Sequence, residues 1–329
     1  MSTDSAEVVT RTMLERLQLH LRHRRLRALA LFGAVFWLGA CSAQQIKVPL
    51  RPFYLPADPF LGRVELDVPY RDDAQADAEK HRLDLFLPEG EGWPMLLFVH
   101  GGSLEKGDTS QRVVGHDIYR NIGRYYAARG VAVALVNYRL QPDVHWKEQV
   151  DDVARATDFV ERQLERLGGD GRLYLSGHSA GAWLVSRVAL NHELWMEYGW
   201  HDDTVDGVIS ISGSGYDLTD ELTWKWFGRE KRWARRFSLV PGERSWKERA
   251  SVVPLIHKGA PPFLLLHSKR EHRALVRQNT LFCDALRESD VVCDREEIPG
   301  HGHRRMLLAI SHDRRPVAGK ILAELGDDE

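Results

Sequence analysis

Short apolar segments alternate with longer amphipathic segments along most of this 329-residue chain, and this rhythm limits the fold more than any other feature. Several of the apolar segments are unbroken runs of Val, Leu and Ile, as in parallel strands that are buried on both faces. Strands are predicted at 82–87, 95–99, 131–137, 172–176, 206–212, 262–267 and 291–298. Helices are predicted between or after them, at 117–129, 147–167, 181–192, 273–288 and 304–325. This alternation predicts an α/β fold with a mostly parallel central sheet and helices on both faces.

The N-terminal region differs from the rest of the chain in charge and hydropathy. Residues 1–40 contain six Arg and three Asp or Glu, and the arginines precede an apolar run, 28–38, that is short for a membrane span. This order predicts an export signal peptide over 1–40. Leu38-Gly39-Ala40-Cys41 resembles the lipobox of bacterial lipoproteins, which implies that Cys41 is lipidated and anchors the protein in the bacterial cell envelope, facing the periplasm. The alternative is an uncleaved signal anchor with an incidental cysteine.

The remaining chain is expected to form a proline-rich tether over 41–65 and one large domain over 66–329. The formal net charge is only −2, so nucleic acid is not an expected partner. Within the domain, 217–258 interrupts the rhythm with four Trp among several Lys and Arg. This insertion either covers a ligand site as a lid or wall, or packs down as a surface helix, or contacts anionic lipid headgroups.

Residues 177–181 read Gly-His-Ser-Ala-Gly and directly follow a predicted strand. The G-x-S-x-G pattern builds a sharp strand-to-helix turn that exposes its serine. Ser179 is therefore the candidate nucleophile. The amide of Ala180, at the start of the next helix, is placed to hold an acyl oxyanion.

The motif and its surroundings resemble α/β-hydrolase esterases of the group that contains BD-FAE-like enzymes, kynurenine formamidases and hormone-sensitive-lipase-like carboxylesterases. The resemblance covers about residues 80–325 and implies the α/β-hydrolase fold and a Ser-His-acid triad. Further matches, which we expect to serve packing and loop anchoring, are Gly107-Asp108, Asn137-Tyr138-Arg139-Leu140, Asp152, and the Ser212-Gly213 and Tyr216-Asp217-Leu218 elements.

The resemblance also implies an oxyanion hole. His100-Gly101-Gly102-Ser103 resembles the HGGG motif of esterases, in which backbone N–H groups face the acyl oxygen. The amides of Gly102 and Ser103 are thereby expected to join that of Ala180. Ser103 stands where the motif usually has glycine, so a stiffer loop is expected, with a hydroxyl near the site.

The other two triad members follow from the same resemblance. Residues 298–303 resemble the Pro-Gly-x-Gly-His loop of family members, which implies His303 as the base, with His301 as its rival. Residues 267–271 resemble the His-Gly-x-x-Asp turn, with Glu271 at the aspartate position. Glutamate is an accepted version of the triad acid, and Asp290 is the alternative.

Two cysteines, Cys283 and Cys293, remain in the domain. In an oxidising compartment they either pair across a helix-to-strand connection or stay buried as free thiols.

The expected reaction is hydrolysis of short acyl or acetyl esters, small-molecule substrates, through an acyl-enzyme and without a metal or organic cofactor. One alternative is an arylformamidase-like amide hydrolase. Another is a catalytically inactive hydrolase fold that serves as a binding protein, an option that the departures at Ser103, Ser268 and Glu271 keep open.

Overall fold

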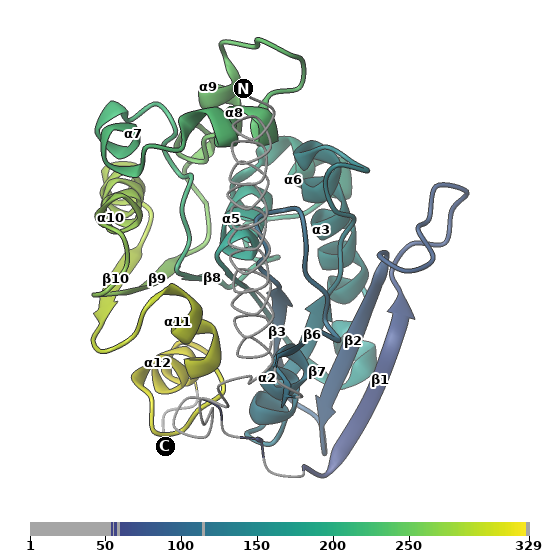
Figure 1. Ribbon diagram of the computed structural model, residues 1–329. Coiled ribbons are helices and arrows are strands. Elements are labelled where there is room, and N and C mark those ends of the chain that lie inside the picture. Colours follow the sequence, from purple (N-terminus) through teal and green to yellow (C-terminus); the bar gives the residue numbers. More distant parts are fainter. Residues whose placement is uncertain (1–53, 55, 58–59, 114–115, 327–329) are drawn as a thin grey trace, which may run out of the picture. The chain divides into compact units, whose positions relative to one another are not determined.

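An eight-stranded sheet forms the centre of the domain in the computed structural model, which describes residues 54, 56–57, 60–113 and 116–326 (Figure 1). The strand order is β1-β2-β6-β3-β7-β8-β9-β10. The pairs β1–β2 and β2–β6 are antiparallel, and the strands from β6 to β10 run parallel. The strands are β1 (Gly62–Pro69), β2 (Arg82–Pro88), β3 (Trp93–Val99), β6 (Ala132–Val136), β7 (Gly169–His178), β8 (Gly207–Ile211), β9 (Phe263–Ser268) and β10 (Cys293–Ile298). The short strands β4 (Arg112–Val113) and β5 (His116–Asp117) form a separate pair.

Helices cover both faces of this sheet. On one face lie α3 (Trp146–Glu161), α5 (Ala180–Leu190) and α10 (Arg273–Glu288), and on the other lie α2 (Tyr119–Ala127), α11 (His303–Ala309) and α12 (Pro316–Glu324). Strand β3 contributes to both cores, since Met95, Leu97 and Val99 pack in one cluster while Leu96 and Phe98 pack in the other. The predicted α/β layering and the buried parallel strands are therefore confirmed.

The boundary of the domain differs from the prediction. Strand β1 starts at Gly62, inside the segment predicted as a tether, and it pairs with β2. The Tyr54 hydroxyl donates to the carbonyl of Asp117, and the amide of Ala57 donates to Asn121 Oδ1 of α2. The described part of the segment 41–65 is thus docked on the domain. β1 escaped prediction because six of its eight side chains are exposed, which leaves no apolar pattern.

Two predicted helices are interrupted. The helix predicted over 304–325 is split into α11 and α12, because a proline tolerates the first turn of a helix but not its interior. Pro316 therefore begins α12, and Arg315 before it is extended. The helix predicted over 147–167 is split into α3 and the single turn α4 (Leu164–Leu167). A further helix that was not predicted, α6 (His192–Tyr198), follows α5, and Asn191 caps its N-terminus by accepting from the amide of Glu193.

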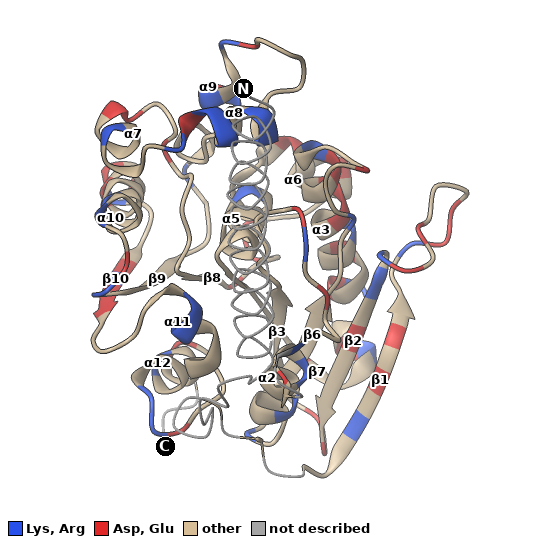
Figure 2. Ribbon diagram, in the orientation of Figure 1, with Lys and Arg blue, Asp and Glu red and all other residues tan. Residues whose placement is uncertain are grey.

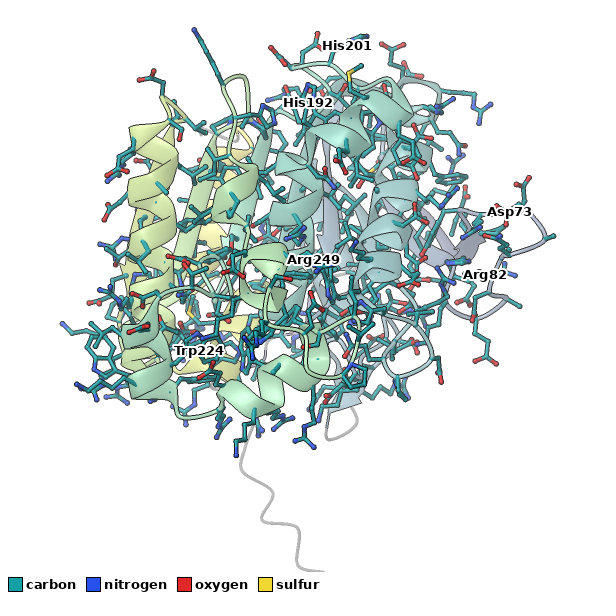
Figure 3. The ribbon with its side chains drawn as sticks, turned by 90° about the horizontal axis from the view of Figure 1, so that it is seen from above. Asp73, Arg82, His192, His201, Trp224 and Arg249 are labelled. Carbon is teal, nitrogen blue, oxygen red and sulfur yellow. A yellow bond between two sulfur atoms is a disulfide. The ribbon has the colours of Figure 1, made fainter. Side chains whose placement is uncertain are left out.

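The insertion 217–258 contains α7 (Glu221–Phe227), α8 (Glu230–Phe237), α9 (Trp246–Ala250) and the 3₁₀ turn η1 (Val253–Leu255). Figure 2 shows the basic residues of α8 and α9 gathered on this part of the domain. Its tryptophans pack together, since the Trp224 ring lies 5.7 Å from those of Trp233 and Trp246. Figure 3 shows Trp224 seen from above. The tryptophans pack as expected for a surface helix, one of the three predictions for this insertion. The insertion also contributes a wall to the site described below, as the first of those predictions proposed.

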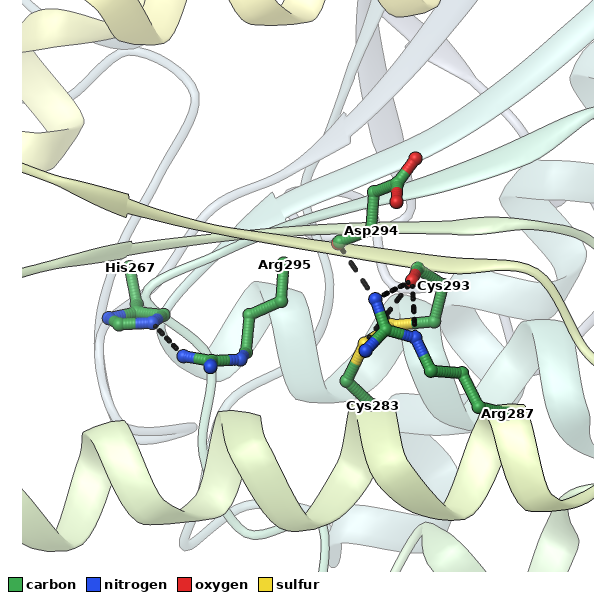
Figure 4. The surroundings of a disulfide bond; sticks show 6 residues. All are labelled: His267, Cys283, Arg287, Cys293, Asp294 and Arg295. Atoms are coloured by element: carbon green, nitrogen blue, oxygen red, sulfur yellow. Dashed lines mark hydrogen bonds between the residues drawn. A yellow bond between two sulfur atoms is a disulfide. The ribbon is translucent and has the colours of Figure 1, made fainter.

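A disulfide joins Cys283 of α10 to Cys293 of β10, with the Cα atoms 5.7 Å apart (Figure 4). Arg287 donates from Nε and Nη2 to the carbonyl of Cys293, which fixes the same connection. Of the two states left open for these cysteines, the structure has the bridge. The predicted signal peptide over 1–40 and the predicted lipidation site at Cys41 lie outside the described residues. No helix in the described ranges is long and apolar enough to cross a membrane.

Candidate active site

The predicted site residues come together where the parallel strands end. β7 ends directly before Ser179, β9 leads into the turn that carries Glu271, and β10 leads into the loop before His303. The loop 100–103 follows β3, the neighbour of β7. Because parallel strands end at the same edge of a sheet, four loops that are distant in sequence meet there.

Ser179 lies on a strained strand-to-helix turn. Its φ is +59° and its ψ is −114°, a conformation that costs a non-glycine residue of order 1–3 kcal/mol. Glycine at 181 allows α5 to approach β3, since a Cβ there would lie 2.1 Å from the carbonyl oxygen of Val99. The amide of Ser179 donates to Ile211 O at 2.9 Å, so β8 holds the turn. The local structure therefore presents the serine hydroxyl at the sheet edge.

His303 contacts both of its expected partners. Its Nε2 lies 2.9 Å from Ser179 Oγ, and its Nδ1 lies 3.1 Å from Glu271 Oε1. The Glu271 side chain is fully buried, whereas that of His303 is 35% exposed. With Nδ1–H donating to the carboxylate, Nε2 is the acceptor for the serine hydroxyl.

The alternative base and acid lie elsewhere. His301 is buried and donates from Nδ1 to the carbonyl of Pro299 at 2.7 Å, so it shapes the loop before His303. Asp290 is exposed and follows α10, directly before the strand that begins at Cys293. The beginning and the end of a strand lie at opposite edges of the sheet, so Asp290 is remote from His303.

The loop predicted to form an oxyanion hole has two residues with positive φ. Gly102 has φ +125°, and a Cβ there would lie 1.6 Å from the carbonyl oxygen of Lys106, so only glycine fits. Ser103 has φ +61°, which glycine adopts freely and serine at a cost. Within the described residues, the amides of Gly102, Ser103 and Ala180 donate to no protein acceptor. Ser103 and Ala180 line the same cavity as Ser179.

His100 supports this loop from beneath. Its Nδ1 donates to the carbonyl of Gly101 at 2.7 Å, and its ring stacks on that of Tyr138 at 4.5 Å. Burial lowers the pKa of His100 to about 4, so the ring is neutral at physiological pH.

The departure at Ser268 also has a structural role. Its hydroxyl donates to the carbonyl of His301 and accepts from the amide of Arg270. Since Ser268 begins the turn to Glu271, this side chain ties the loop of the acid to the loop of His303.

His178, the variable residue of the G-x-S-x-G motif, makes a contact that the sequence did not indicate. Its Nε2 donates to the backbone carbonyl of His303 at 3.0 Å, and the two rings lie 5.0 Å apart. Burial and the neighbouring His303 lower the pKa of His178 to about 3. The ring therefore remains a neutral donor that fixes the backbone of His303.

A small cavity of about 60 Å³ opens on Ser179. Trp183 of α5 and Trp233, Arg236 and Phe237 of α8 form its wall. Arg236 is buried and donates from Nη2 to Glu105 Oε1 at 2.6 Å, which joins α8 to the loop after Ser103. The sequence indicated the insertion as a wall but not which of its residues reach the site.

The outer matches anchor loops, as expected. Asp152 is buried and accepts from His81 and from the backbone and guanidinium of Arg139. Asn137 holds the amide of Thr109, beside the oxyanion loop. The Tyr216 ring stacks on Phe282 at 4.2 Å.

The BD-FAE family model matches residues 83–286 of this chain. The isoprenylcysteine alpha-carbonyl methylesterase ICME of Arabidopsis thaliana is 27% identical over 247 residues, which are 70% of this chain and 56% of that protein. Esterase LipC of Mycobacterium tuberculosis is 28% identical over 228 residues, which are 65% of this chain and 54% of that protein. The chain thus spans little more than half the length of these curated relatives.

Solved structures share the fold. Esterase B from Lactobacillus rhamnosis superimposes with a TM-score of 0.66 at 21% identity, covering 91% of this chain and 94% of that chain. The esterase of the archeon Pyrobaculum calidifontis has a TM-score of 0.63 at 20% identity, covering 82% and 87%. These likenesses establish the α/β-hydrolase fold for this domain.

Proposed function

The chain belongs to the BD-FAE family, and on this premise we propose that it is a serine carboxylic ester hydrolase that acts on short acyl or acetyl esters. The observation that carries the proposal is the pair of contacts of His303, 2.9 Å to Ser179 Oγ and 3.1 Å to Glu271. A serine within hydrogen-bond reach of an imidazole, which a buried carboxylate orients in turn, is the arrangement of an activated nucleophile.

In the proposed reaction, Ser179 Oγ attacks the ester carbonyl carbon while His303 Nε2 takes the hydroxyl proton. The carbonyl oxygen becomes an oxyanion that accepts hydrogen bonds from the amides of Gly102, Ser103 and Ala180. Collapse of the tetrahedral intermediate breaks the bond to the alkoxy group, which leaves as an alcohol with the proton from His303. Water, deprotonated by His303, then attacks the acyl-enzyme; the bond to Ser179 Oγ breaks as His303 returns the proton to Oγ, and the carboxylic acid is released.

The dimensions of the cavity support a short acyl group. A volume of about 60 Å³ beside Ser179 holds only a few heavy atoms, and Trp183, Trp233 and Phe237 limit its extension. Hydrophobic pockets discriminate single methylene groups by about 1–3 kcal/mol, so the acyl chain length is the expected specificity variable.

Turnover of p-nitrophenyl acetate by purified wild type, Ser179→Ala and Ser245→Ala tests the proposal. Ser245 is exposed at the start of α9, so its variant controls for serine removal as such. We expect turnover by wild type and Ser245→Ala, and loss of at least 10³-fold in Ser179→Ala. No turnover by wild type, together with no labelling of Ser179 by a fluorophosphonate, would refute hydrolysis and favour a binding protein. Faster turnover of an aryl formamide than of any ester would instead indicate a formamidase-like enzyme.

We also propose that the protein is anchored to the bacterial cell envelope through lipid on Cys41 and faces the periplasm. The support is the Leu38-Gly39-Ala40-Cys41 sequence after an arginine-rich and apolar segment. Cell fractionation checks this directly. The wild type is expected in the membrane fraction and Cys41→Ala outside it; a variant that stays with the membrane would contradict lipidation as the anchor.

A further inference from the structure

A second and larger cavity, of about 590 Å³, lies behind the helix that follows the nucleophile. It has no lining residue in common with the cavity at Ser179. Trp183 separates the two, because it lines the first cavity and its ring packs 5.7 Å from Trp146, which lines the second. Figure 3 shows His192 of α6 and Arg249 of α9, two residues that line the second cavity.

Arg187 of α5 is a buried charge at this cavity. The residue is 6% exposed, and its guanidinium lies 4.7 Å from the ring centre of Trp146 and 5.3 Å from that of Trp183. Its Nη1 donates to the carbonyls of Arg249 and Ser251, at 3.2 and 2.8 Å. Nε is buried without an acceptor in the described part of the chain, and Nη2 takes part in neither bond.

Among the described residues, no Asp or Glu forms an ion pair with Arg187. Burial lowers the pKa of Arg187 to about 10, which still leaves the guanidinium protonated at neutral pH. A buried charge without a counter-ion costs several kcal/mol, and the two tryptophan faces and two carbonyls offset only part of that cost. An anion in the cavity would supply the missing partner.

The other charged side chains of the lining are partly or fully exposed at its rim. Asp151 pairs with Arg155 and Arg249 with Glu243. Lys147 is exposed, and its Nζ lies 5.9 Å from the ring centre of Trp146. Glu193 and Glu248 add negative charge at the rim, which disfavours a multiply charged anion. Apolar side chains make up much of the remaining wall: Val150, Leu190, Leu194, Leu255 and Ile256.

We propose that this cavity binds a small monocarboxylic acid with a short hydrocarbon chain, its carboxylate paired with Arg187 and its chain against the apolar wall. The size, the single buried cation and the apolar lining together select this class of ligand. The inference does not depend on hydrolysis at Ser179, although it concerns the same helix.

Thermal unfolding and calorimetric titration with sodium butyrate and sodium hexanoate test the proposal on the whole domain, against sodium chloride at equal ionic strength. We expect one site per chain and a rise in Tm of about 2–5 °C at tenfold excess over Kd, larger for hexanoate at equal concentration. Absence of any rise beyond that in chloride would overturn the proposal.

Two variants locate the site. Arg187→Met removes the charge and is expected to abolish the carboxylate-dependent rise while leaving the ligand-free Tm unchanged or higher, because an uncompensated charge has been removed. If Arg187 has only a structural role, the ligand-free Tm of Arg187→Met should be lower than that of wild type, and wild type should show no carboxylate response. Leu255→Trp fills the cavity from its rim with Arg187 intact, and should also abolish binding if Arg187→Met does not fold.

Arg166→Gln is the matched control, since Arg166 of α4 is exposed and does not line this cavity, and the variant should retain the response. A carboxylate response that persists in both Arg187→Met and Leu255→Trp would assign the acid to another site, such as the cavity at Ser179, and would refute the proposal.

Discussion

Replacement of Glu271 by glutamine isolates the contribution of the buried carboxylate to the proposed reaction. When His303 takes the proton of Ser179, its imidazolium lies 3.1 Å from Glu271 Oε1. At an effective dielectric constant of about 20, unit charges 3–4 Å apart attract by about 4–5 kcal/mol, which corresponds to roughly 10³–10⁴-fold in rate. Because the His303 side chain is 35% exposed and water screens part of this attraction, we expect kcat for p-nitrophenyl acetate to fall about 10³-fold in Glu271→Gln.

The pattern of kinetic constants matters as much as the size of the loss. Glu271 contacts His303 and does not line the cavity, so KM should change by less than about threefold. Glu271→Asp should retain more activity than Glu271→Gln, since it keeps the charge at a longer distance. Asp290→Asn is the matched control and should leave kcat unchanged. An unchanged kcat in Glu271→Gln with intact folding by circular dichroism, or an equal loss in Asp290→Asn, would refute this account of the acid.

Three further outcomes are expected. Trp233→Ala should widen the cavity and raise kcat/KM for hexanoate relative to acetate esters by about tenfold, and an unchanged ratio would contradict its role as a wall. The pKa of buried His178 is about 3, below the free value of about 6.5, so its stabilising effect is complete above pH 6.5 and is lost as pH falls. Urea unfolding at several pH values measures this effect. Between pH 6 and 4, the unfolding free energy of wild type should fall with decreasing pH more steeply than that of His178→Gln, by up to about 1.4 kcal/mol per pH unit. Equal slopes in the two proteins would be inconsistent with a neutral buried ring. The double variant Cys283→Ser, Cys293→Ser should lose about 3 kcal/mol of unfolding free energy, which corresponds to a Tm lower by roughly 6–12 °C. Its Tm should equal that of wild type after reduction of the disulfide, which serves as the internal check.

The sequence predicted the elements whose pattern is strong. All seven predicted strands form. The central parallel strands β3, β6, β8 and β9 are buried throughout, which requires unbroken apolar runs. Edge strand β1 has no such pattern, and the C-terminal helix restarts at Pro316, which lies within an otherwise periodic segment. Local composition thus specified the centre of the sheet better than its edge.

The candidate site was predictable as far as it rests on motifs. Ser179, Gly102 and His303 lie in short patterns whose spacing fixes their place at the ends of strands. The role of Glu271 was harder to predict, because a single carboxylate in a charged turn has no sequence pattern of its own. Its contact with His303 is made only in the folded domain. The walls from α8 and the buried Arg187 were not predictable, since both depend on how helices that are distant in sequence pack against α5.

The packing of α5 on β3 brings together two motifs whose first residues, His100 and Gly177, are 77 positions apart in the chain. Gly181 lies so close to the end of β3 that an added Cβ would be 2.1 Å from Val99 O and 2.8 Å from His100 O. Val99 is the last residue before the loop that carries Gly102, and Gly181 follows Ala180 directly. The distance between the amides of Gly102 and Ala180 is therefore fixed by how closely α5 approaches β3. Any side chain at 181 would push the helix away and spread the donors of the proposed oxyanion hole, even though residue 181 itself touches no substrate. The second glycine of the G-x-S-x-G motif thus sets the spacing of the proposed oxyanion hole in addition to allowing the turn that exposes the serine.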